Sequence, residues 1–137
     1  MTKRWLIKSE PSAWSWDDQV NKGVEAWTGV RNYQASNNLK AMRIGDTCYF
    51  YHSVEERRIV GIVEVVREAF PDPTEPESRW VAVDVKTVQP VNNPVTLAQI
   101  KAEPRLENIA LVRQSRLSVV PLTEEHWQVL WAMTLQK

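Results

Sequence analysis

The sequence holds few of the residues that most often carry catalysis or bind metals: one cysteine, two histidines and four glycines among 137 residues. The lone Cys48 excludes an internal disulfide framework and fits a reducing compartment. His52 and His126 lie far apart in the chain and, even with Cys48, match no usual metal-ligand spacing, so we expect no metal. The glycines stand singly at 23, 29, 45 and 61, which argues against a phosphate-binding Walker loop.

The chain also lacks an excess of either charge and a long apolar run. Its 17 basic residues balance 17 acidic ones, which argues against non-specific coating of nucleic acid but allows local readout. The most apolar stretch, IVGIVEVV at 59–66, is short and contains a glutamate, so we expect no membrane contact. The start, MTKRWLIKSEP, has too short an apolar run for a signal peptide. These features predict a cytoplasmic protein, or a nuclear one in a eukaryote.

Nucleophilic catalysis has no convincing arrangement either. On one strand, Cys48 and His52 would lie roughly 13 Å apart, too far for a hydrogen bond. Cys48 is better read as a small buried apolar side chain. Glu10 stands between Ser9 and Pro11 at a strand end, and a solvated glutamate in a turn is the alternative to an acid/base role. We therefore predict a protein without catalytic activity or cofactor.

The patterns that are present predict one α+β domain over residues 1–137. Alternating or continuous apolar runs predict strands at 4–9, 47–53, 57–66, 80–88 and 116–122. Capping residues and 3.6-residue periodicity predict helices at 16–22, 33–43, 97–102 and 124–134. The proline-rich stretch at 70–76 predicts a loop. Helices inserted among several strands favour a curved sheet that closes on itself.

Tryptophan is abundant, with seven residues in this short chain. Four of them are predicted to pack in the core, from strands or from the final helix: Trp5, Trp80, Trp127 and Trp131. Trp14 and Trp16 flank Ser15 in a predicted loop and could line a surface.

Trp27 differs in its neighbours, within the stretch AWTGVRNYQASNN at 26–38. Gly29 allows a ligand or another strand to approach the backbone. Arg31 and Asn32 supply hydrogen-bond donors just before a helix. Together they favour a pocket for a flat ligand with a polar edge. The alternative is that Trp27 packs in the core while Arg31 pairs with a carboxylate.

Four segments together resemble the EVE domain family: KSEP at 8–11, WTGVRNYQA at 27–35, FYHS at 50–53 and RQSRLSV at 113–119. The GD at 45–46 and the DP at 72–73 fit as well, and the resemblance covers almost the whole chain. It implies a PUA-like mixed β pseudo-barrel with several flanking helices, related to ASCH and YTH domains. It also implies a reader of modified nucleobases, modified cytosine in particular.

We therefore hypothesise that Trp27 stacks on a base extruded from DNA or RNA, and that the protein acts as a monomer. The residues predicted to bind the base are Lys8, Ser9, Glu10, Trp27, Gly29, Val30, Arg31, Asn32, Tyr33, Tyr51, His52, Ser53, Ser115, Arg116 and Leu117. Lys40 and Arg43 are predicted to contact phosphates. On this hypothesis Trp27→Ala abolishes binding with little loss of fold. A small-molecule or nucleotide sensor, and a weak base-processing hydrolase using Glu10 or His52, remain as alternatives.

Overall fold

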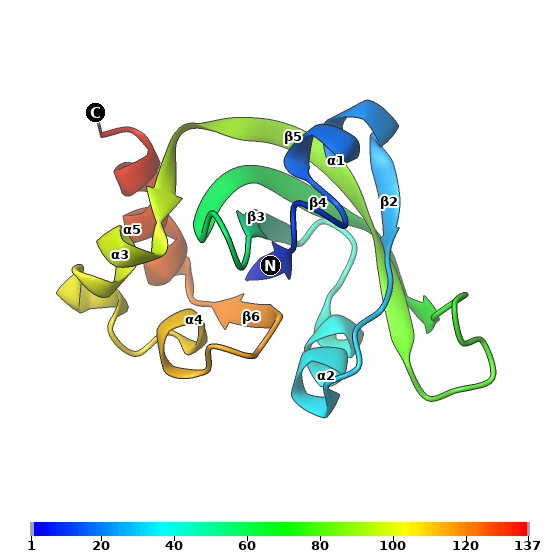
Figure 1. The fold of residues 1–137 in the computed structure, drawn as a ribbon. Coiled ribbons are helices and arrows are strands. Elements are labelled where there is room, and N and C mark those ends of the chain that lie inside the picture. Colours follow the sequence, from blue (N-terminus) through cyan, green and yellow to red (C-terminus); the bar gives the residue numbers. More distant parts are fainter. Residues whose placement is uncertain (1, 137) are drawn as a thin grey trace.

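A computed structural model describes residues 2–136 as an α+β fold built on a six-stranded mixed sheet (Figure 1). The strands are β1 (Arg4–Ser9), β2 (Val24–Trp27), β3 (Thr47–His52), β4 (Arg58–Pro71), β5 (Val81–Thr96) and β6 (Val119–Leu122). Their order in the sheet is β2-β5-β4-β3-β1-β6, and β1 and β3 run parallel while the other neighbours are antiparallel. Within residues 2–136, β2 and β6 do not pair with each other. The predicted pseudo-barrel is thus open rather than closed.

The helices begin where side chains cap them. They are α1 (Trp16–Lys22), α2 (Tyr33–Ala41), α3 (Leu97–Lys101), α4 (Ala110–Arg113) and α5 (Glu124–Thr134), with a 3₁₀ turn, η1, at Pro104–Leu106. Ser15, Asn32, Thr96 and Thr123 each accept a backbone N–H bond at the N-terminus of α1, α2, α3 and α5. This confirms the four predicted starts, because a capping side chain satisfies a donor that the helix leaves free. Helices α3–α5 lie on one side of the central strands, and α1 and α2 on the other (Figure 1).

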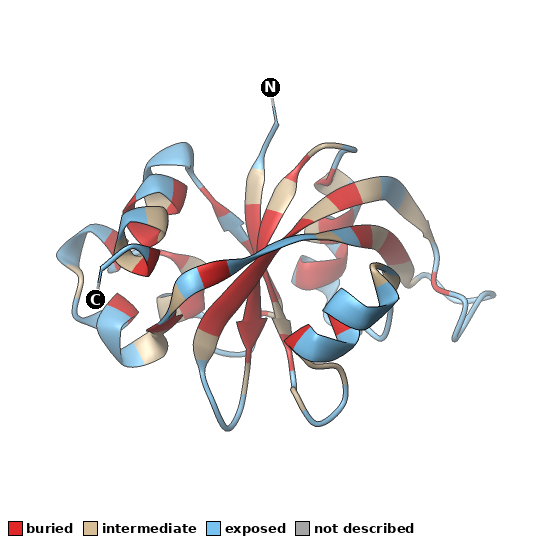
Figure 2. Ribbon diagram, turned by 90° about the horizontal axis from the view of Figure 1, so that it is seen from above, coloured by how far each residue is buried: buried red, intermediate tan, exposed pale blue. Residues whose placement is uncertain are grey.

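The core runs along the central strands, and the outer faces of the helices are exposed (Figure 2). Tyr49 and Phe50 of β3 are fully buried at its centre. Trp16 and Trp27 both pack edge-on against Phe50, with ring centroids 5.3 and 5.5 Å away. Cys48 is also fully buried, as expected of a small apolar side chain. No helix in residues 2–136 is long and apolar enough to cross a membrane.

β2 and α4 were not predicted, and three strand boundaries differ from the prediction by more than one residue. β4 continues through Pro71 and β5 through Thr96, because the two strands pair along most of their length with several register shifts. β6 begins only at Val119, so residues 116–118 precede it. Trp80 was expected in the core but lies half-buried just before β5, where its ring packs on Tyr33 with centroids 5.3 Å apart.

Candidate functional site

The ends of β1, β3 and β6 bring three distant segments together. In the parallel pair of β1 and β3, Lys8 lies opposite Tyr51 and Ser9 opposite His52. The N–H of Ser53 donates to the carbonyl of Ser9 at 2.9 Å, which continues this pairing beyond the strands. The N–H of Lys8 donates to the carbonyl of Ser118 at 3.0 Å, just before β6. The KSEP, FYHS and RQSRLSV segments therefore meet at one end of the sheet.

A cavity of about 420 Å³ opens between this end of β1 and the loop after β2. That volume falls within the range of about 300–1,000 Å³ typical of small-ligand sites. Six of the predicted base-binding residues line it: Lys8, Ser9, Trp27, Gly29, Val30 and Arg31. The cavity is thus built from three of the four segments that the sequence singled out, KSEP, WTGVRNYQA and, through Ser118, RQSRLSV, with backbone and side-chain polar groups around an aromatic wall.

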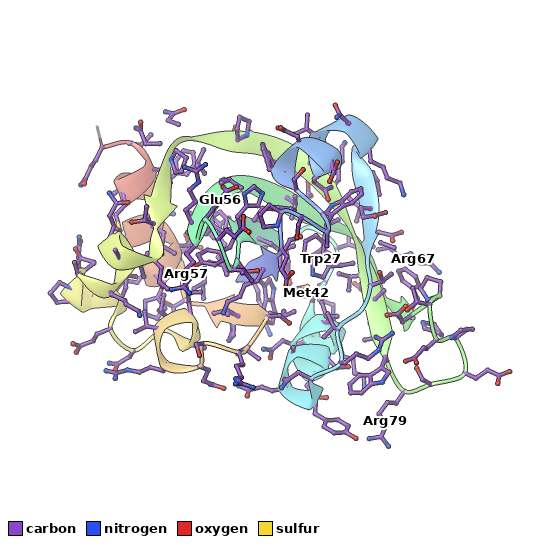
Figure 3. All side chains as sticks on the ribbon, in the orientation of Figure 1. Trp27, Met42, Glu56, Arg57, Arg67 and Arg79 are labelled. Atoms are coloured by element: carbon purple, nitrogen blue, oxygen red, sulfur yellow. The ribbon has the colours of Figure 1, made fainter. Side chains whose placement is uncertain are left out.

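Trp27 serves both the core and the cavity. It lies between β2 and the central strands (Figure 3), and only 7% of its surface is exposed. One part of the indole packs on Phe50, at an interplanar angle of 84°, while another part lines the cavity. The expectation that Trp27→Ala leaves the fold almost intact is therefore wrong on packing grounds, since truncating a buried Trp typically costs about 3–5 kcal/mol.

The loop after Trp27 is held by one buried carboxylate, Asp72. Its Oδ2 accepts from the N–H of Gly29 at 2.9 Å and from Nη1 of Arg31 at 3.0 Å, and its Oδ1 accepts from Thr74. Burial alone would raise the pKa of Asp72, but the hydrogen bonds from Thr74, Gly29 and Arg31 outweigh it and lower the pKa to about 2. Gly29 has φ +82°, a conformation that suits glycine.

Arg31 and Asn32 both have structural partners. Besides Asp72, the guanidinium of Arg31 reaches Glu75 at 3.1 Å, which matches the alternative of a paired arginine. Oδ1 of Asn32 accepts the N–H of Ala35 at 2.9 Å and caps α2. Their contact with a base stays a prediction. Tyr33 is exposed and packs at a tilt against Trp80, outside the cavity.

Seven more of the predicted base-binding residues lie in two neighbouring hollows, whereas Tyr33 and His52 line neither. Glu10, Tyr51 and Ser53 line a groove of about 820 Å³, together with Lys8, Ser115 and Arg116. Burial raises the pKa of Tyr51 to about 12, only partly offset by Arg57. A smaller hollow of about 290 Å³ is lined by Asn32, Ser115, Arg116 and Leu117. The structure therefore distributes the predicted pocket over three adjoining hollows.

His52 has a structural place. The backbone N–H of Trp16 donates to its Nε2 at 3.0 Å, so in the neutral ring the proton lies on Nδ1, which faces Glu56 at 2.9 Å. This hydrogen bond from His52 is the main reason why the pKa of Glu56 lies below its usual range. Because both ring nitrogens are engaged, the imidazole joins β3 to α1. Across residues 2–136, no three His, Cys, Asp or Glu side chains cluster in a way that could hold a metal ion.

Lys40 and Arg43, predicted to contact phosphates, lie at the C-terminus of α2. The guanidinium of Arg43 donates to the carbonyls of Lys40 and Met42, both at 3.1 Å, and so satisfies acceptors at the helix end. Neither residue lines the cavity or the groove. Their role as phosphate contacts stays a prediction.

The sequence reasoning missed half of the cavity wall: Ala13, Trp14, Glu25, Ala26, Thr28 and Ser118. Trp14 had a signal, because a tryptophan in a loop is a candidate for a surface. Its indole N–H donates to Gln19 at 3.0 Å, which fixes the ring on α1. Ala13 carries no local signal, and Ser118 lies within RQSRLSV but was not selected from it. Only the packing of the loop and of the chain before β6 places these two residues at the cavity.

The open pseudo-barrel with flanking helices places this protein in a class of small α+β domains. The EVE domain model matches residues 3–133, and the chain belongs to this family. A solution structure of a protein from Rhodopseudomonas palustris is 53% identical and covers 99% of this chain and 97% of its own, with a TM-score of 0.92. An ASCH protein from Zymomonas mobilis, 18% identical with a TM-score of 0.59, shares the fold alone.

Human thymocyte nuclear protein 1 is similar as well. Its sequence is 31% identical over 97% of this chain and 74% of the human protein. A crystal structure of the human protein in complex with DNA containing 5-methylcytosine covers 99% of each chain at 32% identity, with a TM-score of 0.93.

Proposed function

We propose that this protein is a non-catalytic nucleic-acid-binding module that reads a modified base, such as modified cytosine, extruded into the cavity beside Trp27. The observation that carries the proposal is the cavity itself, whose size suits a small flat ligand and whose wall is aromatic on one side. The human relative solved with DNA containing 5-methylcytosine supports the choice of ligand. One copy of the chain supplies the whole cavity, so we propose that it acts as a monomer.

Energetics shape the expected affinity. Stacking on an aromatic ring contributes about 1–3 kcal/mol per base, and extruding a base costs a few kcal/mol. These contributions nearly cancel, so contacts with phosphates must supply much of the net affinity. Binding is therefore expected to weaken as salt is raised.

The base-processing alternative loses geometric support from the candidate groups. His52 is engaged through both ring nitrogens, and Glu10 lines the groove rather than the cavity. Neither side chain is therefore placed to act on a base inside the cavity.

The test should fill the cavity without cutting into the core. Ala13 is exposed and lines the cavity, so Ala13→Phe places a ring in it and leaves Trp27 intact. We expect this variant to lose at least tenfold in affinity for oligonucleotides carrying 5-methylcytosine, while its thermal unfolding stays close to that of the wild type. Ala132→Phe, at an exposed alanine of α5, is the matched control and should bind normally.

The panel pairs plain strands with strands carrying 5-methylcytosine, 5-hydroxymethylcytosine or N6-methyladenine, as DNA and as RNA, at stated salt. Unchanged binding by the Ala13→Phe variant would show that the base does not bind in this cavity. Equal binding of a free modified nucleoside and of the same base in a strand would favour the small-molecule sensor. Product formed on long incubation would overturn the non-catalytic proposal.

A further inference from the structure

The groove beside the cavity is basic. It measures about 820 Å³ and runs from the end of β1 past the β3–β4 turn toward α3 and the segment before β6. Four cationic side chains and one carboxylate line it: Lys8, Arg57, Lys101, Arg116 and Glu10. The protein as a whole has no net charge, so this concentration of cations is a local feature of the fold.

These four cations have no acidic partner. Within residues 2–136, every ion pair involves other basic groups, such as Arg4 with Glu124 or Arg58 with Glu56. A groove in which four such cations face a single carboxylate, Glu10, still carries an excess of positive charge and concentrates anions. An anionic ligand is therefore the occupant that the charges favour.

The position of Lys8 also favours an anionic ligand, because this residue lies where the cavity and the groove meet. It lines both the cavity and the groove, as does Ser118. Its Nζ donates to the carbonyl of Ser115 at 2.9 Å, a neutral acceptor, and burial lowers its pKa. A half-buried ammonium with a neutral partner gains most from an anion that replaces its lost hydration.

The second of these cations, Arg57, lies in the β3–β4 turn, where the backbone is strained. Val54 and Arg57 have φ of 70° and 48°, although neither is a glycine. Such a conformation is unfavourable for a branched residue such as valine and often marks a functional segment. The Nε of Arg57 donates to the carbonyl of Val54 at 3.0 Å, which holds the guanidinium at the groove (Figure 3).

We infer that this groove binds the sugar-phosphate backbone on one side of the extruded base, with Lys8 contacting a phosphate at the junction between groove and cavity. The inference rests on the proposed function and adds the path of the strand. It differs from the sequence-based expectation, in which the phosphates contact Lys40 of α2 and Arg43 just after this helix.

Two exposed groove cations can be tested without disturbing the core. In the double variant Lys101→Gln/Arg116→Gln, each lost phosphate contact should lower the slope of log affinity against log salt by about 0.7–0.9. Plain and modified strands should weaken by the same factor, at least tenfold at low salt, so the preference for the modified base is kept. Arg67→Gln/Lys86→Gln removes the same charge from exposed positions of β4 and β5 that line neither the cavity nor the groove, and should change neither quantity.

The outcomes separate this inference from the proposed function. If the wild type prefers the modified base and the groove variant binds and responds to salt as the wild type does, the inferred role of the groove is wrong and the proposed function stands. If the wild type shows no preference for the modified base and the groove variant binds every strand more weakly, the inferred role of the groove stands and the proposed function as a reader is wrong. Absence of binding to every strand at low salt overturns both.

The direction of the strand gives a second measurement. Because the groove leaves the cavity on one side, adding nucleotides on one side of the modified base should raise affinity more than adding them on the other. That gain should disappear in Lys101→Gln/Arg116→Gln. Equal gains on both sides, retained in this variant, would contradict a backbone path through the groove.

Discussion

Two buried aspartates show how single residues fix the backbone, Asp46 at the start of β1 and Asp72 beside the candidate site. Asp46 accepts from the backbone N–H groups of Lys3 and Arg43 and from the indole N–H of Trp5. Asp72 does the same for the loop that follows Trp27. Both acids belong to the short motifs GD at 45–46 and DP at 72–73, which the sequence offered only as part of the resemblance to EVE domains. Their carboxylates are the acceptors that these segments need, since a buried donor without a partner is costly.

Asp72 predicts a dependence of stability on acid. Its pKa falls from an ordinary value of 3.8 to about 2 on folding, so the carboxylate stabilises the fold above the unfolded value. That contribution, about 2 kcal/mol, is lost as the pH falls through the folded pKa. The stability advantage of the wild type over Asp72→Asn, measured by urea unfolding, should therefore shrink between pH 4 and pH 2. A constant difference across this range would contradict the role of the charge.

At this scale the sequence indicated the cavity wall but not the partners of its residues. Trp27, Gly29 and Arg31 do lie together at a cavity, as their spacing suggested. The groups that engage Arg31 come from Asp72 and Glu75, far along the chain, and no local pattern reports such a contact. The sequence therefore left open whether Arg31 pairs with a carboxylate, and the fold gives it two.

Helix starts were predictable at the scale of elements, whereas strand lengths were not. A cap such as Ser15 or Thr123 acts within a few residues, so its signal is local. The extent of β4 and β5 depends on how long each finds a partner, and their register shifts keep the two paired past the ends of the apolar runs. The prolines at 90 and 94 lie inside β5, where a purely local reading ends the strand.

Gly61 allows α1 to pack closely against β4. A Cβ at this position would lie 2.4–2.5 Å from three atoms of the outer ring of Trp16. Gly61→Ala should therefore lower the free energy of unfolding by about 1–3 kcal/mol, as overpacking does. Urea unfolding of the wild type and the variant measures this difference.

A second substitution separates this clash from other effects of the alanine. Trp16→Phe removes the outer ring that a Cβ would meet, so in its presence Gly61→Ala should cost clearly less. If the two substitutions instead add, the close approach of Trp16 is not what requires glycine at this position.

For the whole molecule, the lone cysteine reports on unfolding. Cys48 is fully buried at the centre of the sheet, and burial raises the pKa of its thiol, so the reactive thiolate is suppressed in the folded protein. Labelling by a thiol reagent in native buffer should be at least a hundredfold slower than in strong denaturant, and should accelerate as urea is added. Equally fast labelling in both conditions would place Cys48 at the surface.

The pairing of β1 with both β3 and β6 has a consequence for how the protein is made. Arg4 lies opposite Leu122 in the sheet, so β1, the first strand of this sheet in the chain, cannot complete its pairing before β6, the last of them, has been synthesised. Contacts between such distant parts of a chain form slowly. The cavity and the groove both include Ser118, just before β6. The candidate site is therefore completed late in synthesis, and a chain interrupted before β6 has the aromatic wall but no complete cavity.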